Sequence, residues 1–95
     1  MRKLNEVFCS FNGVSGFYYV LNITPNILLR AGEMYIREAK LSKEYGDTIF
    51  IMKLTVLRDG SEMSFEDILN LEISDFNMLL KSINKQYGKI RSSFE

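Results

Sequence analysis

Histidine is missing from the sequence, and cysteine occurs once, at Cys9. Histidine is the commonest general base and a frequent metal ligand, so its absence argues against the usual catalytic triads and zinc sites. A single cysteine cannot form an internal disulfide, so nothing indicates an oxidising compartment. Cys9 falls in a predicted strand, where cysteine is typical of a small buried apolar residue rather than a nucleophile. We therefore expect no catalytic residue, no cofactor and no metal site.

The chain also lacks an excess of positive charge and a long apolar run. It has 12 Lys and Arg residues against 12 Asp and Glu residues, whereas proteins that bind nucleic acid usually carry a clear basic excess. The longest apolar stretch, Ile49 to Leu57, is too short to span a bilayer and contains Lys53. No signal peptide is evident at the N-terminus. We expect a cytoplasmic protein with no membrane contact, for which nucleic acid is an unlikely partner.

What the chain does contain is enough apolar residues for one small core. It has 95 residues, of which 46% are hydrophobic, and residues 1–95 are predicted to form a single domain. Aromatic and β-branched residues dominate Glu6 to Phe11 and Phe17 to Ile23, on either side of a loop with two glycines. This pattern predicts a β-hairpin, which needs other elements to pack on. The predicted fold class is α+β, mostly α, with an N-terminal β-hairpin (residues 1–23) packed on a bundle of three to four helices (residues 24–92).

Helix start and stop signals divide the region after the hairpin. Thr24 can cap a helix that has Pro25 at its first position, and this helix is predicted to run to Tyr45 and end at Gly46. Ile27, Ala31 and Met34 follow a helical spacing and are predicted to face the core. The next segment, residues 47–58, fits either a strand or a helix by its own pattern.

The C-terminal half contains three further signals. Asp59 and Gly60 predict a turn. Ser64 is followed three residues later by an acid, as in a capping box, and predicts a short helix to about Asn70. Ser74 is predicted to cap the last helix, which runs to about Lys89 or beyond.

The last helix carries an apolar seam that we take as the candidate binding site. Its residues are spaced alternately by four and three, as the inner positions of a heptad are: Phe76, Leu80, Ile83, Tyr87, Ile90 and Phe94. The seam could face the domain's own core, or its C-terminal part could dock another chain. The predicted protein-binding residues are Leu80, Ile83, Tyr87, Ile90 and Phe94, together with a lysine row on one helix face, Lys81, Lys85 and Lys89.

Charge is segregated along this half of the chain. Six acids and no bases lie from Asp59 to Asp75, and no acid lies from Phe76 to Phe94. Acids near a helix start and bases near its end suit the helix dipole, so the acidic block is interpreted first as a solvated cap. The lysine row could instead meet an acidic surface of a partner.

Two stretches resemble tail assembly chaperones of long-tailed phages and related contractile particles. They are Ile51 to Leu57 and, after an acidic spacer, Met63 to Phe76, preceded by a helix similar to the family's over Arg30 to Leu41. The chain departs from the family pattern at Val56, where glycine is usual, and in its aromatic N-terminus. The resemblance implies a non-catalytic protein that keeps a tape-measure protein soluble, and it favours a helix for residues 47–58.

Two other functions remain open from the sequence. A small phage-type inhibitor of a host enzyme could use the acidic block as a nucleic-acid mimic, and a nucleic-acid-binding regulator could use the lysine row. In both the chaperone and the inhibitor the partner is a protein, and the apolar seam could also serve self-association.

Overall fold

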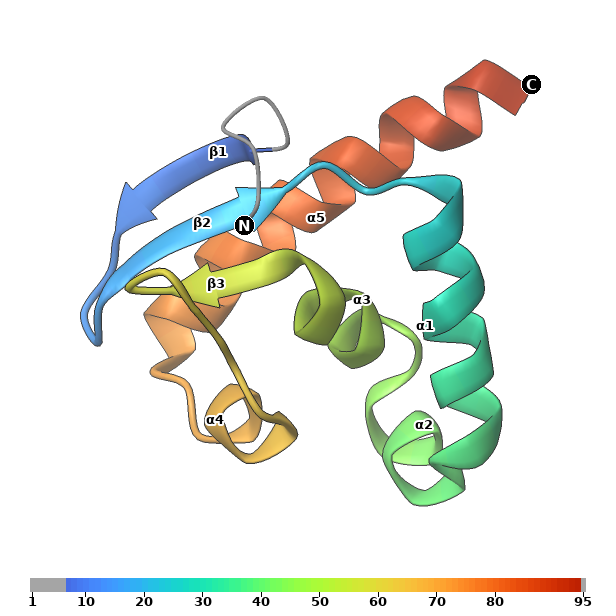
Figure 1. The fold of residues 1–95 in the computed structure, drawn as a ribbon, viewed down its shortest axis with the longest axis horizontal. Coiled ribbons are helices and arrows are strands. Elements are labelled where there is room, and N and C mark those ends of the chain that lie inside the picture. The colour runs from blue at the N-terminus through green and yellow to red at the C-terminus, as the bar shows by residue number, and fades with distance from the viewer. Residues whose placement is uncertain (1–6, 95) are drawn as a thin grey trace.

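The computed structural model describes residues 7–94, with side chains described as far as Gln86. The predicted α+β class is confirmed, with helix predominating over strand. Within the described residues, an antiparallel sheet has the strand order β1-β2-β3-β4 and is accompanied by five helices (Figure 1). The strands β3 and β4 come from the region after residue 23, for which helices were predicted and only residues 47–58 were left open between helix and strand.

The hairpin forms as predicted, from β1 (Val7–Asn12) and β2 (Phe17–Leu21). The N–H of Gly13 donates to the carbonyl of Gly16 across the loop at 2.8 Å. The register is continuous from Cys9 to Asn12 and shifts between Val7 and Cys9, as in a β-bulge. The other side of β2 pairs with β3 (Val56–Arg58), so the hairpin is half of a larger sheet.

The helix predicted from Thr24 to Tyr45 is divided in two. Thr24 does cap α1 (Pro25–Arg37), accepting a hydrogen bond from the N–H of Ile27 at 3.2 Å. The helix ends at Glu38, whose φ of −100° and ψ of 63° are not helical, and α2 (Ala39–Tyr45) follows. The predicted stop is confirmed at Gly46, which has a φ of 67°, a conformation that favours glycine.

The ambiguous segment contains both alternatives. Residues 48–55 form α3 (Thr48–Thr55), and the chain enters β3 directly at Val56. The expectation of a helix was therefore right up to Thr55 and wrong for Val56 to Arg58, because pairing with β2 takes over there. Four consecutive apolar side chains of α3, Ile49 to Met52, are buried, as in a helix enclosed on several sides.

The remaining elements complete the sheet and cover it. The turn at Asp59 and Gly60 joins β3 to β4 (Ser61–Glu62). The capping box is confirmed at α4 (Phe65–Leu69), where Ser64 and Asp67 exchange hydrogen bonds. The last helix, α5 (Ile73–Phe94), begins before Ser74, so the predicted cap at Ser74 is wrong.

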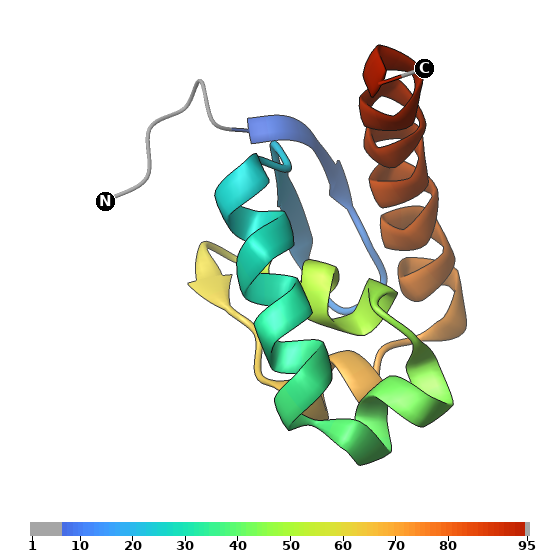
Figure 2. The ribbon, with the colours of Figure 1, turned by 90° about the vertical axis from the view of Figure 1, so that its right-hand side faces the viewer.

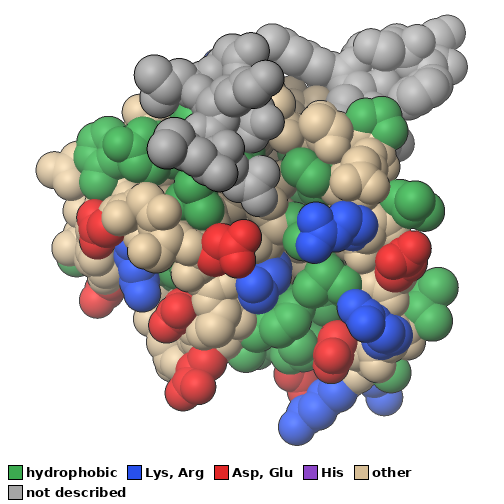
Figure 3. Space-filling view, viewed as in Figure 1, with side chains coloured by type: hydrophobic (Ala, Val, Ile, Leu, Met, Phe, Trp, Pro, Cys, Tyr) green, Lys and Arg blue, Asp and Glu red, His purple; other side chains and the backbone are tan. Residues whose placement is uncertain are grey.

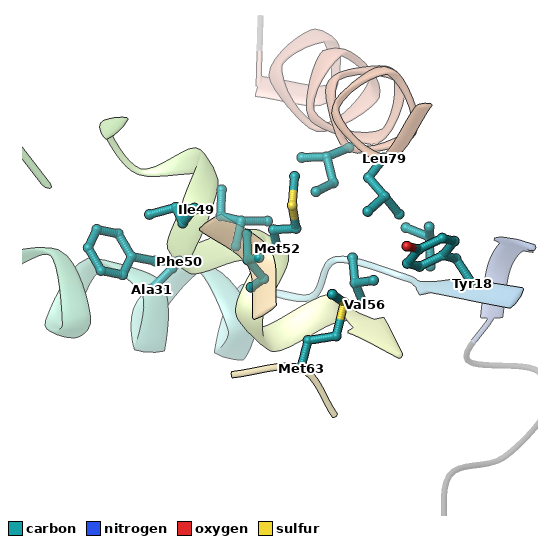
Figure 4. Packing of buried hydrophobic residues seen from close by; sticks show 12 residues of the cluster. Tyr18, Ala31, Ile49, Phe50, Met52, Val56, Met63 and Leu79 are labelled. Atoms are coloured by element: carbon teal, nitrogen blue, oxygen red, sulfur yellow. The ribbon is translucent and has the colours of Figure 1, made fainter. Parts of the chain in front are cut away.

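The core lies between the sheet, α3 and α5 (Figure 4). Tyr18, Val20 and Val56 come from the strands, and Phe50 and Met52 from α3. Further core residues come from the other helices, Ala31, Ile68, Leu79 and Ile83, and Met63 comes from the connection between β4 and α4. Figure 2 shows α1 and α5 on different sides of the molecule. The two helices do not form the single apolar surface that a long N-terminal helix and a C-terminal seam would have made together.

Candidate protein-binding surfaces

The helix α5 is fixed to the hairpin at two positions, Asp75 near its start and Gln86 about three turns further on. At the first position, the Asp75 carboxylate accepts hydrogen bonds from the hairpin loop, from the N–H groups of Val14 at 2.8 Å and Ser15 at 3.0 Å. At the second, the amide of Gln86 accepts from the N–H of Ile23 at 2.8 Å and donates to the carbonyl of Leu21 at 3.1 Å. Gln86 thus continues the hydrogen bonding of β2 where the strand ends.

Asp75 was predicted as part of a solvated acidic block, and this expectation is wrong. Its side chain is 2% exposed, and it also accepts a hydrogen bond from the Tyr18 hydroxyl at 2.8 Å. Burial by itself would raise the pKa of Asp75, but the loop N–H groups, the Tyr18 hydroxyl and the charge of Arg58 hold it below its ordinary value. Burial and the same carboxylate raise the pKa of Tyr18. The cluster is a structural clamp, in which each polar atom has a partner.

Two other acids of the block, Asp59 and Asp67, also have roles in the fold. Asp59 accepts from the N–H of Phe17 at 3.0 Å and donates its own N–H to the Phe17 carbonyl at 2.7 Å. Asp67 caps α4, and its carboxylate lies 3.7 Å from the Arg58 guanidinium. The Ser64 hydrogen bonds and Arg58 lower the pKa of Asp67. The block therefore does not present a continuous row of free carboxylates, which an imitation of nucleic acid would need.

The predicted seam on α5 is only partly in place. Ile83 is 2% exposed and belongs to the protein's own core, so it presents no surface to a partner. Leu80 is half-buried, while Lys81 and Lys85 are exposed. The side chains of Tyr87, Lys89, Ile90 and Phe94 lie outside the described part, although the backbone of α5 extends past the sheet (Figure 1).

The buried face of α5 has a different phase from the predicted seam. Its fully buried positions are Asp75, Leu79, Ile83 and Gln86, whereas the seam passed through Phe76 and Leu80. The two phases share Ile83, but the buried one includes the polar residues Asp75 and Gln86, so the sequence favoured the apolar seam. The buried phase could have been found only by recognising that a polar residue at 75 and another at 86 bind the ends of the hairpin.

A groove runs between β1 and α5. Cys9 donates its S–H to the Ser82 hydroxyl at 3.5 Å at one end, and Asp75 binds the hairpin loop at the other. Two hollows of about 330 Å³ and 240 Å³ lie along it, and both are lined by Met78. Lys81 and Lys85 line the smaller hollow. Two lysines of the predicted row therefore line a concave surface. The sequence alone did not predict this concavity.

A third hollow, of about 470 Å³, lies where α1 faces Gly46, Asp47 and α3. On the α1 side it is lined by Leu28, Ala31, Gly32 and Tyr35. Beside it on the same helix, Leu29 is 63% and Ile36 is 79% exposed. We call Leu28, Leu29, Gly32, Tyr35 and Ile36 the α1 strip. Figure 3 shows hydrophobic side chains gathered in the region of α1 to α3 with charged side chains around them.

The α1 strip is held in place from beneath. The Tyr35 ring packs edge-on against Phe50, with ring centroids 6.1 Å apart, and Phe50 packs in turn against Phe65 at 5.7 Å. Ala31 is buried against the core. The inward residues of α1 were predictable from their spacing, but Leu29 and Ile36 fall outside that stripe and were missed as surface candidates.

Comparison of the chain with protein-family models, curated proteins and solved structures finds no match. Within residues 7–94, no helix combines the length and the apolar character needed to cross a bilayer. The side chains described as far as Gln86 bring together no group of three metal-ligating residues.

Proposed function

We propose that this protein is a non-catalytic protein-binding module that holds an amphipathic helix of a client against the α1 strip. The observation that carries the proposal is the exposure of Leu29, Tyr35 and Ile36 beside an apolar hollow on one helix. Single exposed apolar residues are ordinary on protein surfaces, but a contiguous group beside a concavity is typical of a binding site.

The geometry of the α1 strip suits a helical client. Its residues follow spacings of three, four and seven, so they form one band along α1, and helix-in-groove recognition uses the same spacings on the bound helix. Gly32 lies in the middle of the band, and a Cβ built on it would meet no atom within 4 Å. The missing side chain leaves room for the backbone of a bound helix to come close.

We further propose that the client is a tape-measure protein, as in the tail assembly chaperones that the sequence resembles. A tape-measure protein of the coiled-coil type exposes long apolar helix faces before the tail forms, and the α1 strip would cover one such face. A gene cluster with neither a tail-tube gene nor a tape-measure gene beside the gene for this chain would contradict the chaperone role.

Co-expression with a tape-measure protein from the same gene cluster tests the proposal. We expect the client to stay in the supernatant with the wild-type chain and to precipitate with the double variant Leu29→Ser/Ile36→Ser. The matched control is Ile73→Ser, which removes an apolar side chain that is 70% exposed on α5. If the double variant folds and retains the client as well as the control does, the α1 strip is not the binding surface.

A second variant fills the hollow without removing any contact. Gly32→Leu adds a side chain where a Cβ has open space, and it replaces glycine with a strong helix former. Thermal stability is expected to stay the same or rise while client binding falls. Unchanged binding in a correctly folded Gly32→Leu protein would contradict docking at this position.

A further inference from the structure

We propose that the groove between β1 and α5 is a second binding site, which takes an extended acidic segment of a partner protein as an added strand. The segment would pair with the outer side of β1 and place its carboxylates on Lys81 and Lys85. This surface lies on another part of the molecule from the α1 strip and is independent of it.

Within the described residues, the outer side of β1 offers backbone hydrogen bonds at Ser10 and Asn12. Among the described residues 7–94, β1 is an edge strand, and its partner in the sheet is β2. Phe17 directs both its N–H and its carbonyl towards Asp59, away from β1. Asn12 lies opposite Phe17 in the register, so it is in a non-hydrogen-bonded pair and its own N–H and carbonyl point outwards. Ser10 lies two residues earlier with no bulge between, so its backbone N–H and carbonyl also point outwards.

The helix wall of the groove is apolar at one end and basic at the other. Met78 is 48% exposed and lines both hollows, and Val14, which is 71% exposed, lies at the apolar end. Lys81 and Lys85 line the basic end. Among the side chains that the structure describes, the one acid in the lining is Asp75, and its carboxylate is already bound by the hairpin loop and Tyr18. The groove therefore favours negative charge.

The spacing of the groove fits an extended chain in particular. Lys81 and Lys85 are one helical step of four residues apart, which is about 6 Å along the axis. Alternate residues of a strand lie about 6.7 Å apart on the same face. The helix and β1 also run in opposite directions, since Cys9 contacts Ser82 while the loop after β1 contacts Asp75. The preferred ligand thus has two acids separated by one residue, with an apolar side chain two positions further, over Met78.

A labelled peptide tests this motif directly. A fluorescein-labelled peptide containing Leu-Thr-Glu-Thr-Glu, and the reversed order Glu-Thr-Glu-Thr-Leu, are titrated with the full chain and followed by anisotropy. Binding of either order in the micromolar range is expected, and it should weaken as salt is raised. The control peptide Leu-Thr-Thr-Glu-Glu has the same composition but adjacent acids, and should bind several-fold more weakly. No binding of either ordered peptide, or equal binding of the control, would overturn the proposal.

Two variants and one spectroscopic readout locate the site. Lys81→Glu/Lys85→Glu is expected to weaken binding roughly tenfold or more, because two attractions become repulsions. Lys40→Glu/Lys43→Glu makes the same charge change on α2 and should leave affinity within about twofold. In the wild-type complex, the amide signals of Ser10 and Asn12 should shift and gain protection from hydrogen exchange. Binding without any change at these two amides would overturn strand addition.

The remaining results separate this site from other occupants. Single-stranded oligothymidylate that displaces the peptide with equal affinity would mean a general polyanion site and would overturn the peptide proposal. A peptide-induced loss of a dimer, seen by light scattering, would identify a second copy as the occupant and would also overturn it. Leu29→Ser/Ile36→Ser should bind the peptide with the same affinity as wild type. The peptide experiment therefore still tests the groove between β1 and α5 if the α1 strip proves not to bind the client.

Discussion

Replacing Asp75 by Asn tests the clamp between the hairpin loop and α5. The substitution keeps the shape of the side chain but turns one acceptor oxygen into a donor. Whichever way the amide is placed, the N–H of either Val14 or Ser15 then faces an NH2 group and loses its partner. The Tyr18 hydroxyl can rotate to accept instead, so its contact is weakened rather than lost.

The size of the effect follows from the contacts that change. A hydrogen bond to a charged group contributes about 1.5–3 kcal/mol, and a buried donor left without a partner has a similar cost. One such loss, with weakening of the other two contacts, gives a decrease of about 2–4 kcal/mol in the free energy of unfolding. For a domain of this size that corresponds to a fall of roughly 10–30 °C in Tm.

Urea unfolding followed by circular dichroism measures this change. Glu72→Gln is the matched control, because Glu72 is exposed just before α5, and it should stay within about 0.5 kcal/mol of wild type. Tyr18→Phe should cost less than Asp75→Asn, and the two substitutions together should show a coupling of about 0.5–3 kcal/mol. If Asp75→Asn unfolds within about 0.5 kcal/mol of wild type, the clamp does not stabilise the fold.

Four further predictions concern the fold. Gly13→Ala should lower stability by about 2 kcal/mol or more in thermal unfolding, because its Cβ would lie 2.9 Å from the Asp75 carboxyl carbon; a neutral result would show that the loop can shift. Gly32→Ala should raise stability by about 0.5–1 kcal/mol, since nothing lies near the new methyl group; a loss would indicate a packing role for Gly32. Ser64→Ala should cost about 1 kcal/mol through loss of the α4 cap, measured by urea unfolding; a change near zero would make the capping box dispensable. Because folding lowers the pKa of Asp75, the ionised carboxylate stabilises the fold at any pH above its ordinary pKa, and this stability is lost as pH falls through the lowered pKa. The free energy of unfolding of Asp75→Asn should therefore change less with acid pH than that of wild type, and the same change in both proteins would contradict the assignment.

Local signals in the sequence were sufficient for the hairpin and for most caps. The two glycines of the hairpin loop, Thr24 with Pro25, Gly46, and Ser64 each act on a few neighbouring residues, so their effects do not depend on the rest of the fold. The structure places strand ends, helix starts and the α2 stop at or near these residues.

Features that depend on distant partners could not be predicted in the same way. Val56 to Arg58 become a strand because β2 lies beside them, although the preceding residues are equally apolar and helical. Asp75 and Gln86 are polar residues on a helix, and nothing near them in the sequence indicates that each binds the hairpin. The groove between β1 and α5 exists only after these contacts set the position of the helix.

The loop at Val14 and Ser15 also bears on how the protein can be labelled or fused. Exposed hairpin tips are usually chosen for inserted tags, because they tolerate extra residues, and Val14 is 71% exposed. Here the backbone at the tip binds a buried carboxylate through two consecutive N–H groups, so an inserted residue would displace at least one of them. This accessible tip is thus a poor insertion point, and a fluorophore is better attached to an exposed side chain of α2, such as Lys40.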